Sequence, residues 1–270
     1  MICLTGDVHH MSMKGANQPY LQGTEVEAAE RYLEIAGKFK IKSTLFFTGK
    51  CILEEYQKIK HLPSNFRLEL GGHTYRAFKP RLPYKLSYRL LNRKNGPFFL
   101  QRHEIRKTVN IFKEFLDYNI VSWRDHAYRN DKNTPRLLKE AGIEYFSDIA
   151  SPRILKPFLK DSLFYVPINV LPDNDYVYHG SRKPGSFNED DLMKKPFQTK
   201  AMTVDKWLEK AQEQVKKIID AGGISTLLVH PTCMEIADNF KTFGKLCHFL
   251  SQYETLFMRE IGDQHVENFK

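Results

Sequence analysis

The chain has 270 residues, of which 41% are hydrophobic, so it is long and apolar enough to bury a sizeable core. No stretch of the sequence approaches the about 20 apolar residues that a membrane-spanning helix needs. The formal net charge of +9, from 41 basic and 32 acidic residues, favours anionic partners such as phosphates, acidic glycans, nucleic acid or an anionic membrane surface.

The cysteines and the first residues bear on the cellular compartment. Cys3, Cys51, Cys233 and Cys247 are far apart and form no C-x-x-C pair, which excludes a zinc finger. The opening residues, "MICLTGD", lack the basic and apolar regions of a secretory signal. We therefore expect a cytoplasmic protein whose thiols are reduced and mostly buried.

The elements expected in chain order alternate between short apolar runs and longer amphipathic ones. The first strand, over 1–6, is followed by a helix over 24–40 that begins with a capping box of Thr24 and Glu27. Strands separated by helices of 10–20 residues are typical of parallel βαβ units, so we predict one barrel-like α/β domain over residues 1–270. Further strands are expected at 43–49, 66–72, 119–123, 143–148, 163–170, 224–230 and 255–261, and further helices at 51–59, 100–118, 133–142, 203–223 and 240–253.

The segment 76–98 is polar, basic and rich in turn residues, and we expect it to form a loop or lid beside the active site. Its mixture of Tyr and Leu with cations is also typical of a segment at a membrane interface, although a solvated basic flap explains the residues equally well. Nucleic acid is not expected as a partner, because no recognisable module with stacking aromatics is present. The basic residues from 79 to 107, set against Glu104 alone, are Lys79, Arg81, Lys85, Arg89, Arg93, Lys94, Arg102, Arg106 and Lys107.

Polar side chains recur where the predicted strands end. Because the carboxyl ends of parallel strands face the same side of a barrel, we expect these side chains to meet in one pocket. A single histidine in such a place is more often a hydrogen-bonded structural residue, but an aspartate with several histidines is a ligand set for zinc or another divalent ion. With one coordination position open, such an ion lowers the pKa of bound water toward about 7. The residues are Asp7, His9, His10, His73, Arg124, His126, Asp148 and His230.

Five segments resemble, in order, the motifs of the polysaccharide deacetylase family, the NodB-homology group of carbohydrate esterases. This resemblance implies a distorted (β/α)₇ barrel of parallel strands that removes acetyl groups from N-acetyl sugars with a divalent metal. The D-V-H-H start and the His-Pro-Thr ending are similar to a diverged branch linked to the biosynthesis of O-antigen and other surface glycans. The segments are "TGDVHH" (5–10), "KSTLFFTGK" (42–50), "LELGGHTYRAF" (68–78), "SWRDHAY" (122–128) and "STLLVHPT" (225–232).

The resemblance also implies a role for each matched residue. Asp7 matches the base that takes a proton from the attacking water, and Arg124 matches the arginine that orients this base. His73 matches a metal ligand. His230 matches the general acid that protonates the departing nitrogen.

Two metal-binding positions of the family are not matched. The second metal histidine falls at Ala77, and the aspartate that normally binds the metal falls at Val8. Either His9 or His10 replaces these ligands, with Asp7 as a further ligand, or the metal has been lost. We favour replacement, with zinc as the ion.

The segment 166–180 has no counterpart in the family's motifs. Asp173, Asp175 and His179 follow a predicted strand there, so they either face the same pocket or belong to an ordinary polar loop. We expect His126, Asp173 and His179 to contact the substrate.

The expected function is metal-dependent deacetylation of an N-acetylated sugar or glycan. The basic segment fits a substrate attached to a phosphate, as in a nucleotide sugar or a lipid-pyrophosphate-linked glycan. Two alternatives stay open: a glycan-binding barrel that has lost its metal, and a hydrolase of another C–N bond such as a cyclic amide. Pocket shape decides between substrates, and the sequence does not give it.

Overall fold

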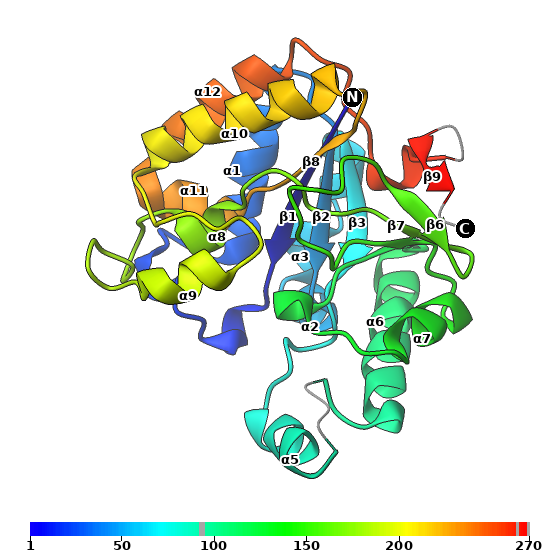
Figure 1. Cartoon of the computed structure of the whole chain (residues 1–270). Coiled ribbons are helices and arrows are strands. Elements are labelled where there is room, and N and C mark those ends of the chain that lie inside the picture. The colour runs from blue at the N-terminus through cyan, green and yellow to red at the C-terminus, as the bar shows by residue number, and fades with distance from the viewer. Residues whose placement is uncertain (92–94, 263–264, 269–270) are drawn as a thin grey trace.

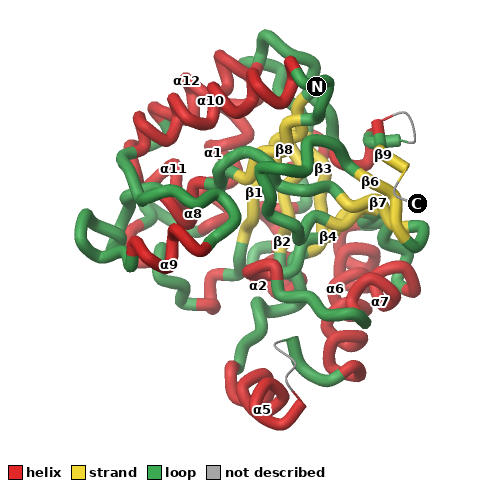
Figure 2. The backbone as a smooth tube through the Cα atoms, viewed as in Figure 1, coloured by secondary structure: helices red, strands yellow, loops and turns green. Residues whose placement is uncertain are grey.

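The computed structural model describes residues 1–91, 95–262 and 265–268. The strands of this part of the chain are β1 (Ile2–Val8), β2 (Ser43–Phe47), β3 (Leu68–Gly72), β4 (Ser122–Trp123), β5 (Tyr145–Phe146), β6 (Phe158–Lys160), β7 (Leu163–Tyr165), β8 (Ser225–Leu228) and β9 (Glu267–Asn268). They form one sheet in the order β8-β1-β2-β3-β4-β5-β7-β6-β9. Figure 2 shows the strands gathered at the centre of the molecule with helices around them.

The sheet is a distorted barrel of parallel strands, as predicted. The run from β8 through β1, β2, β3, β4 and β5 to β7 is parallel at every pairing. Only β6, which the sequence did not suggest, is antiparallel to its neighbour β7. Because the strands are parallel, their carboxyl ends open on one side of the barrel.

A side chain links the region after β7 to β8, which lies at the other end of the strand order. Asn169 Oδ1 accepts the backbone N–H of Thr226 at 2.8 Å, and Asn169 Nδ2 donates to the carbonyl of Ile224 at 2.9 Å. The backbone N–H of Asn169 also donates to the carbonyl of Thr226 at 3.3 Å. These bonds, together with that from the Val170 N–H to the carbonyl of Thr226 at 3.4 Å, join the segment after β7 to β8 without a regular strand ladder among the described residues.

The helices cover the outside of this barrel (Figure 1). No helix in the described part of the chain is long and apolar enough to cross a bilayer. The helices are α1 (Glu25–Lys38), α2 (Gly49–Glu54), α3 (Tyr56–Ile59), α4 (Leu62–Asn65), α5 (Arg81–Leu91), α6 (Phe98–Leu116), α7 (Thr134–Glu140), α8 (Asp173–Tyr176), α9 (Glu189–Lys194), α10 (Val204–Asp220), α11 (Pro231–Asp238) and α12 (Lys241–Leu250).

Helix α1 shows how local and tertiary preferences agree. Its predicted capping box is present: Thr24 Oγ1 accepts the N–H of Glu27, and the Glu27 carboxylate accepts the N–H of Thr24. The helix packs on α11 and α12, where the Tyr32 ring stacks on Phe243 with centroids 3.9 Å apart. This packing fixes the first residue of α1, Glu25, beside the end of β1.

The predicted strand over 255–261 is wrong. Thr255 makes a single bridge to Ile2, and Met258–Glu260 forms a 3₁₀ turn. The Leu256 N–H donates to the carbonyl of Ile2 in β1 at 2.8 Å, but the ladder does not continue. Met258 donates to Thr44 Oγ1 at 3.0 Å and Arg259 to the Glu69 carboxylate at 3.1 Å, so side chains take the N–H groups that a strand would pair.

Two helices outside the sheet differ from the sequence prediction, whereas the cysteines agree with it. Helix α11, directly after His230, was not predicted. The segment 76–98, expected to be a loop, contains helix α5, whereas residues 92–94 of that segment lie outside the described residues. The four cysteines are all buried and free, which confirms the prediction made for them.

Candidate active site

Four residues from separate parallel strands meet at the carboxyl ends of the barrel. Asp7 lies in β1, while His73, Arg124 and His230 directly follow or closely follow β3, β4 and β8. Arg124 Nη1 donates to Asp7 Oδ1 at 3.0 Å. The second carboxylate oxygen of Asp7 lies 3.8 Å from His73 Nε2 and 3.6 Å from His230 Nε2. The sequence prediction that these residues share one pocket therefore matches their placement.

Arg124 is fully buried, and its guanidinium is bonded on several sides. Nη2 donates to Thr5 Oγ1 at 2.9 Å and to Ser147 Oγ at 2.8 Å, and Nε donates to the Ser147 carbonyl at 3.0 Å. The guanidinium also lies 4.4 Å from the centre of the Phe46 ring. A buried charge held by so many contacts has a fixed position, so Arg124 can orient Asp7.

The surroundings of Asp7 keep it ionised. Burial opposes the charged form, but the neighbouring His73, the Arg124 guanidinium and His230 hold the pKa of Asp7 well below its usual range. Its side chain is 7% exposed, so water is largely excluded from it. Asp7 is therefore a carboxylate able to accept a proton.

His230 is held in the opposite state by a second carboxylate. Asp173, the first residue of α8, accepts the Nδ1–H of His230 through Oδ1 and its backbone N–H through Oδ2, both at 2.7 Å. Burial by itself lowers the pKa of His230, but the Asp173 and Asp7 carboxylates outweigh it and raise that pKa to about 10. An ionised acid and a protonated base thus face each other at neutral pH, as general acid–base chemistry requires.

A cluster of three imidazoles, His9, His73 and His126, lies beside Asp7. Their ring centroids are 4.9 to 5.4 Å apart, and one ligand atom from each residue lies within 4.8 Å of the other two. We call these residues the histidine cluster. His9 follows β1, His73 follows β3 and His126 begins a 3₁₀ turn after β4.

Hydrogen bonds settle which nitrogen of two of the rings is unprotonated. His9 Nδ1 donates to Glu25 Oε2 at 2.9 Å, so in the neutral ring Nε2 is the acceptor. His73 Nδ1 donates to the carbonyl of Arg124 at 2.9 Å, so its Nε2 also carries a lone pair. His9 Nε2 lies 3.0 Å from Nδ1 of His126. The acceptor nitrogens of His9 and His73 are therefore presented to the cluster.

His73 Nε2 is buried and has no hydrogen-bond partner among the described residues. Burial lowers the pKa of His73 to about 3, and burial together with the neighbouring His9 and His73 holds the pKa of His126 well below its usual value. Neutral imidazoles with a free lone pair are ligands for zinc and other borderline divalent ions, and three histidines are a known ligand set of open zinc sites. The residues present thus fit a divalent metal.

The two adjacent histidines after β1 point to different neighbours. His9 belongs to the histidine cluster, whereas His10 Nδ1 lies 3.1 Å from Thr48 Oγ1 and its ring is buried there. The sequence left open whether His9 or His10 is a ligand, and the structure places His9 beside His73. His10 lies apart from the cluster, and burial lowers its pKa to about 4.

The residues expected to contact substrate have other neighbours. Asp173 is fully buried and holds His230. His179 donates through Nδ1 to the carbonyl of Val177 at 2.7 Å, and its Nε2 lies 3.4 Å from Cys233 Sγ. His126 does line the cleft, but as a member of the histidine cluster. Asp173 can therefore position His230, but it is too buried to contact a substrate.

Asp148 forms a buried carboxyl pair beside the cleft. It accepts the backbone N–H of Asp125 at 2.7 Å and the Asn130 amide at 3.0 Å. Burial, and then the neighbouring Asp148, raises the pKa of Asp125 well above its usual range, and burial raises the pKa of Asp148 to about 7. The pair stabilises the loop that carries His126.

The sequence analysis missed Glu25. This carboxylate is 4% exposed and accepts both the backbone N–H and the Nδ1–H of His9. Burial opposes its ionisation, but the contacts with His9 hold the pKa of Glu25 below its usual value. A sequence signal was available only in part: an acid at the start of a helix is ordinary, and its distance to His9 depends on the packing of α1.

The cleft above these residues has a volume of about 780 Å³. Its lining includes Asp7, His9, His126 and His230. It also includes the cations Arg81, Arg182 and Lys195 and the acids Glu25, Asp148 and Asp175. An adjoining hollow of about 810 Å³ shares Arg81, Ala127 and Tyr128 with the cleft. The volume of the cleft is sufficient for a sugar, and its lining carries both cations and acids. The adjoining hollow is lined by Phe78, Arg81, Tyr84, Lys85, Tyr88, Ala127, Tyr128, Arg129 and Asn130.

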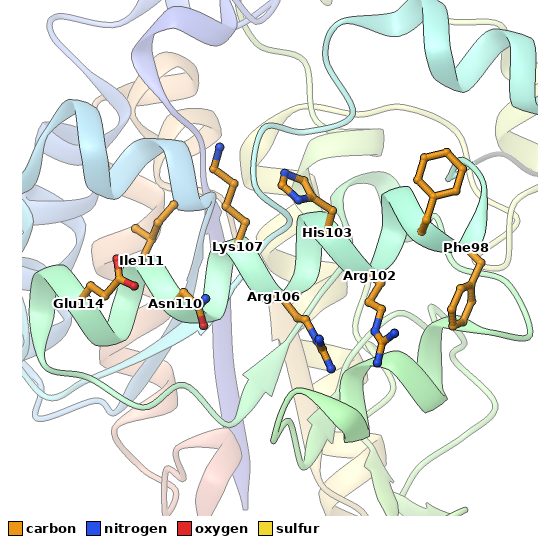
Figure 3. A pocket seen from close by; sticks show the side chains of 9 residues that line it. Phe98, Arg102, His103, Arg106, Lys107, Asn110, Ile111 and Glu114 are labelled. Atoms are coloured by element: carbon orange, nitrogen blue, oxygen red, sulfur yellow. The ribbon is translucent and has the colours of Figure 1, made fainter.

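Figure 3 shows a further hollow, of about 570 Å³, along α6. Its lining side chains, which include Arg102, Arg106 and Phe98, all come from this one helix. A hollow lined by one helix is a shallow part of the surface, and the histidine cluster does not contribute to it. We do not assign it to the candidate active site.

Comparison with known proteins gives the fold but no close relative. No protein-family model and no curated protein matches the sequence. Among solved structures, a Mycobacterium smegmatis protein named as a polysaccharide deacetylase matches with a TM-score of 0.73 at 16% identity, covering 98% of this chain and 89% of that one.

Two other structures share the fold with different activities. PuuE allantoinase matches with a TM-score of 0.63 at 12% identity, covering 95% of this chain and 86% of that one. A Bacillus anthracis pseudoenzyme of carbohydrate esterase family 4 matches with a TM-score of 0.50 at 15% identity, covering 99% of this chain and 63% of that one. At these identities the matches concern the fold alone. The chain therefore has the distorted α/β barrel of the NodB-type polysaccharide deacetylases.

Proposed function

We propose that this protein is a metal-dependent hydrolase that removes the acetyl group from an N-acetylated sugar. The observation that supports this most directly is the unpartnered Nε2 of His73 within the histidine cluster. It lies next to Asp7, which in turn faces His230. A ligand set, a proton acceptor and a proton donor thus lie together at the floor of one cleft.

In this proposal His9, His73 and His126 hold the ion, and zinc is the ion that best suits three imidazoles. When bound, a divalent ion polarises the acetyl carbonyl and makes a nearby water more acidic. Glu25 fixes the ring of His9 through its Nδ1–H, an arrangement typical of metal-binding histidines. Asp7, whose Oδ1 accepts from Arg124, keeps Oδ2 directed toward the reacting groups.

Hydrolysis then needs one proton taken up and one delivered. Asp7 accepts a proton from the attacking water as the oxygen bonds to the carbonyl carbon. His230 donates its Nε2 proton to the sugar nitrogen as the C–N bond breaks, because an amine does not leave as an anion at neutral pH. Acetate and a free amino sugar are the products. Asp173 holds His230 in its protonated form and Arg124 holds Asp7 in its ionised form.

We further propose that the sugar carries a phosphate group. Arg81 and Arg182 line the cleft, and Arg81, Lys85 and Arg129 line the adjoining hollow. Tyr88, which is 49% exposed, lines the same hollow, and its ring can pack against a sugar. A nucleotide sugar and a lipid-pyrophosphate-linked glycan both fit this description. A cytoplasmic location, where such precursors are made, stays a prediction.

Metal analysis of the intact chain, purified without a metal-affinity tag, tests the ligand set. Plasma mass spectrometry should find close to one zinc or other divalent ion per chain in the wild type and little in His73→Ala or His126→Ala. His248→Ala, at an exposed position of α12, is the matched control and should keep its metal. His10→Ala should also keep it, because His10 bonds to Thr48.

Acetate release from a panel of N-acetyl sugars, with and without a phosphate group, tests the reaction. His230→Ala should lose at least about 100-fold in turnover while retaining its metal, since general acid catalysis contributes about 10² to 10⁴. Undiminished turnover in this variant would remove His230 from the role of acid. Absence of metal after reconstitution would favour the alternative of a glycan-binding barrel.

One structural match favours a second candidate reaction on the same site. PuuE allantoinase shares the fold, so a hydrolase of another C–N bond is compatible with the barrel. Cyclic amides should therefore be included in the substrate panel. Turnover of a cyclic amide, with no acetate released from any sugar, would support that reaction in place of deacetylation.

A further inference from the structure

Helix α5 exposes a row of leucines. Leu82, Leu86 and Leu90 are 66%, 47% and 78% exposed, and their spacing of four residues places them along one face of the helix. In Figure 1 this helix stands at one end of the molecule, away from the sheet. A soluble helix usually turns such a row toward the core, so these leucines are available for a partner.

The opposite face of α5 is attached to the protein. Tyr84 and Ser87 are buried, and the Tyr84 ring packs against Phe78 with centroids 5.2 Å apart. The helix therefore has one inward face that holds it and one outward face that carries the leucines. The leucines are exposed because the opposite face of α5 packs against the rest of the protein.

Cations accompany the leucines. Arg81, Lys85 and Arg89 are exposed at the same four-residue spacing, and none of the three forms an ion pair with a described residue. From Lys79 to His103 the sequence contains no aspartate or glutamate. A helix with an apolar row, a cationic flank and no acids matches the composition of helices that lie in the interface of anionic membranes.

We propose that α5 docks this protein on an anionic lipid surface, with its leucines inserted and its cations on the headgroups. A second copy of the chain is a poorer occupant of this face, because two such helices would bring like charges together. A peptide partner usually sits in a groove, whereas α5 projects from the molecule (Figure 1). A bilayer receives a projecting apolar helix directly.

Docking through α5 would place the cleft near the membrane. Arg81 belongs to α5 and also lines the cleft, and Lys85 and Tyr88 of the same helix line the adjoining hollow. A substrate anchored in lipid would reach the cleft along this side. The docking itself does not depend on the proposed deacetylation, and it is measured without turnover.

Vesicle sedimentation tests the proposal with vesicles of phosphatidylcholine alone and of an equal mixture with phosphatidylserine. The wild type should bind the mixed vesicles and release on added salt. Lys85→Gln with Arg89→Gln should lower the partition coefficient about 25-fold, since each cation near an anionic surface contributes about a fivefold gain. Leu82→Ser, Leu86→Ser and Leu90→Ser combined should lower it at least about tenfold.

Matched controls separate these effects from general charge or apolar exposure. Lys206→Gln with Lys210→Gln removes two exposed cations from α10. Leu53→Ser with Met193→Ser removes two exposed apolar side chains, 38% and 45% exposed, from α2 and α9. Both control pairs should bind vesicles as the wild type does. Thermal unfolding should be unchanged in the α5 variants, because the substituted side chains are exposed.

A tryptophan in the leucine row reports insertion directly. The native Trp123 and Trp207 are fully buried, so a blue shift of emission in Leu86→Trp on mixed vesicles would come from α5. No shift, or equal binding of the wild type and the leucine variant, would overturn the proposal. Self-association of the wild type that is lost in the leucine variant, without vesicle binding, would assign the face to a second copy instead. Binding to acidic polypeptides but not to vesicles would overturn it in favour of a protein partner.

Discussion

Replacing Asp173 by asparagine tests whether this carboxylate keeps His230 protonated. Asp173 accepts two hydrogen bonds from His230, each at 2.7 Å. Asparagine removes the negative charge and one of the two acceptors. Burial then dominates, so the pKa of His230 should fall from about 10 to near or below its ordinary value of 6.5. At 1.36 kcal/mol per pKa unit, the rise from 6.5 to about 10 corresponds to about 5 kcal/mol of net stabilisation of the protonated ring, after the opposing cost of burial.

The assay is an NMR titration of the His230 ring in the wild type and in Asp173→Asn. Asp175→Asn is the matched control, because Asp175 lies on the same helix but pairs with Lys195 at 2.7 Å. The control should leave the pKa of His230 high. In the rate profile of the wild type, activity should be lost as pH rises through about 10, and in Asp173→Asn at a lower pH.

Stability gives an independent check with a defined sign. Because the folded pKa of His230 lies above the unfolded value, its stabilising contribution is complete below pH 6.5 and is lost as pH rises through about 10. The free energy of unfolding of the wild type should therefore decline over that window more steeply than that of Asp173→Asn. Equal pKa values for His230 in the two proteins would refute the reasoning.

Three further outcomes follow from buried groups. Glu25→Gln should weaken metal affinity about 10- to 100-fold, measured by competition with a chelating dye, because the carboxylate that fixes His9 is lost; unchanged affinity would count against His9 as a ligand. Arg124→Met should lower the free energy of unfolding by about 3–5 kcal/mol in urea, since the Asp7 carboxylate is left buried without its partner, and a change under 1 kcal/mol, the usual worth of an exposed pair, would contradict this account. Burial raises the pKa of Asp148 to about 7 from 3.8, so the wild type should lose stability as pH rises across that range and Asp148→Asn should show a flatter dependence in the same urea assay; parallel curves would show that Asp148 does not titrate there.

Much of the barrel and part of the site could be predicted from residue patterns. Apolar runs separated by amphipathic ones indicated parallel strands, and parallel strands bring their carboxyl ends to one side. For this reason Asp7, His73, Arg124 and His230 were expected in one pocket, and the structure places the other three side chains 3.0 to 3.8 Å from the Asp7 carboxylate. Local chemistry was sufficient as well for the capping box of α1, which needs only Thr24 and Glu27.

Tertiary structure decided which histidines form the histidine cluster. β1 ends at Val8, so the alternation of a strand no longer says which of the next two side chains points inward. Glu25, brought by α1, holds His9 toward the cluster, whereas Thr48 holds His10 elsewhere. Glu25 and Thr48 both lie outside the first ten residues, so the local sequence does not show which histidine each of them holds.

His126 and α5 show the same limit. His126 reaches the cluster from a turn in which Ala127 has a φ of 57° and Tyr128 a φ of 54°. Residues other than glycine seldom adopt a positive φ, so alanine and tyrosine at these positions did not predict this turn. The leucines of α5 looked like part of a loop because Pro83 and polar residues interrupt them. Local patterns therefore indicated the parallel strands that carry the site, whereas long-range packing decided which side chains meet, which apolar faces stay outside and where the short strand β6 forms. The physical reason is that strand and helix preferences act between neighbours in the chain, whereas ligand sets and exposed faces depend on elements brought together from distant parts of it.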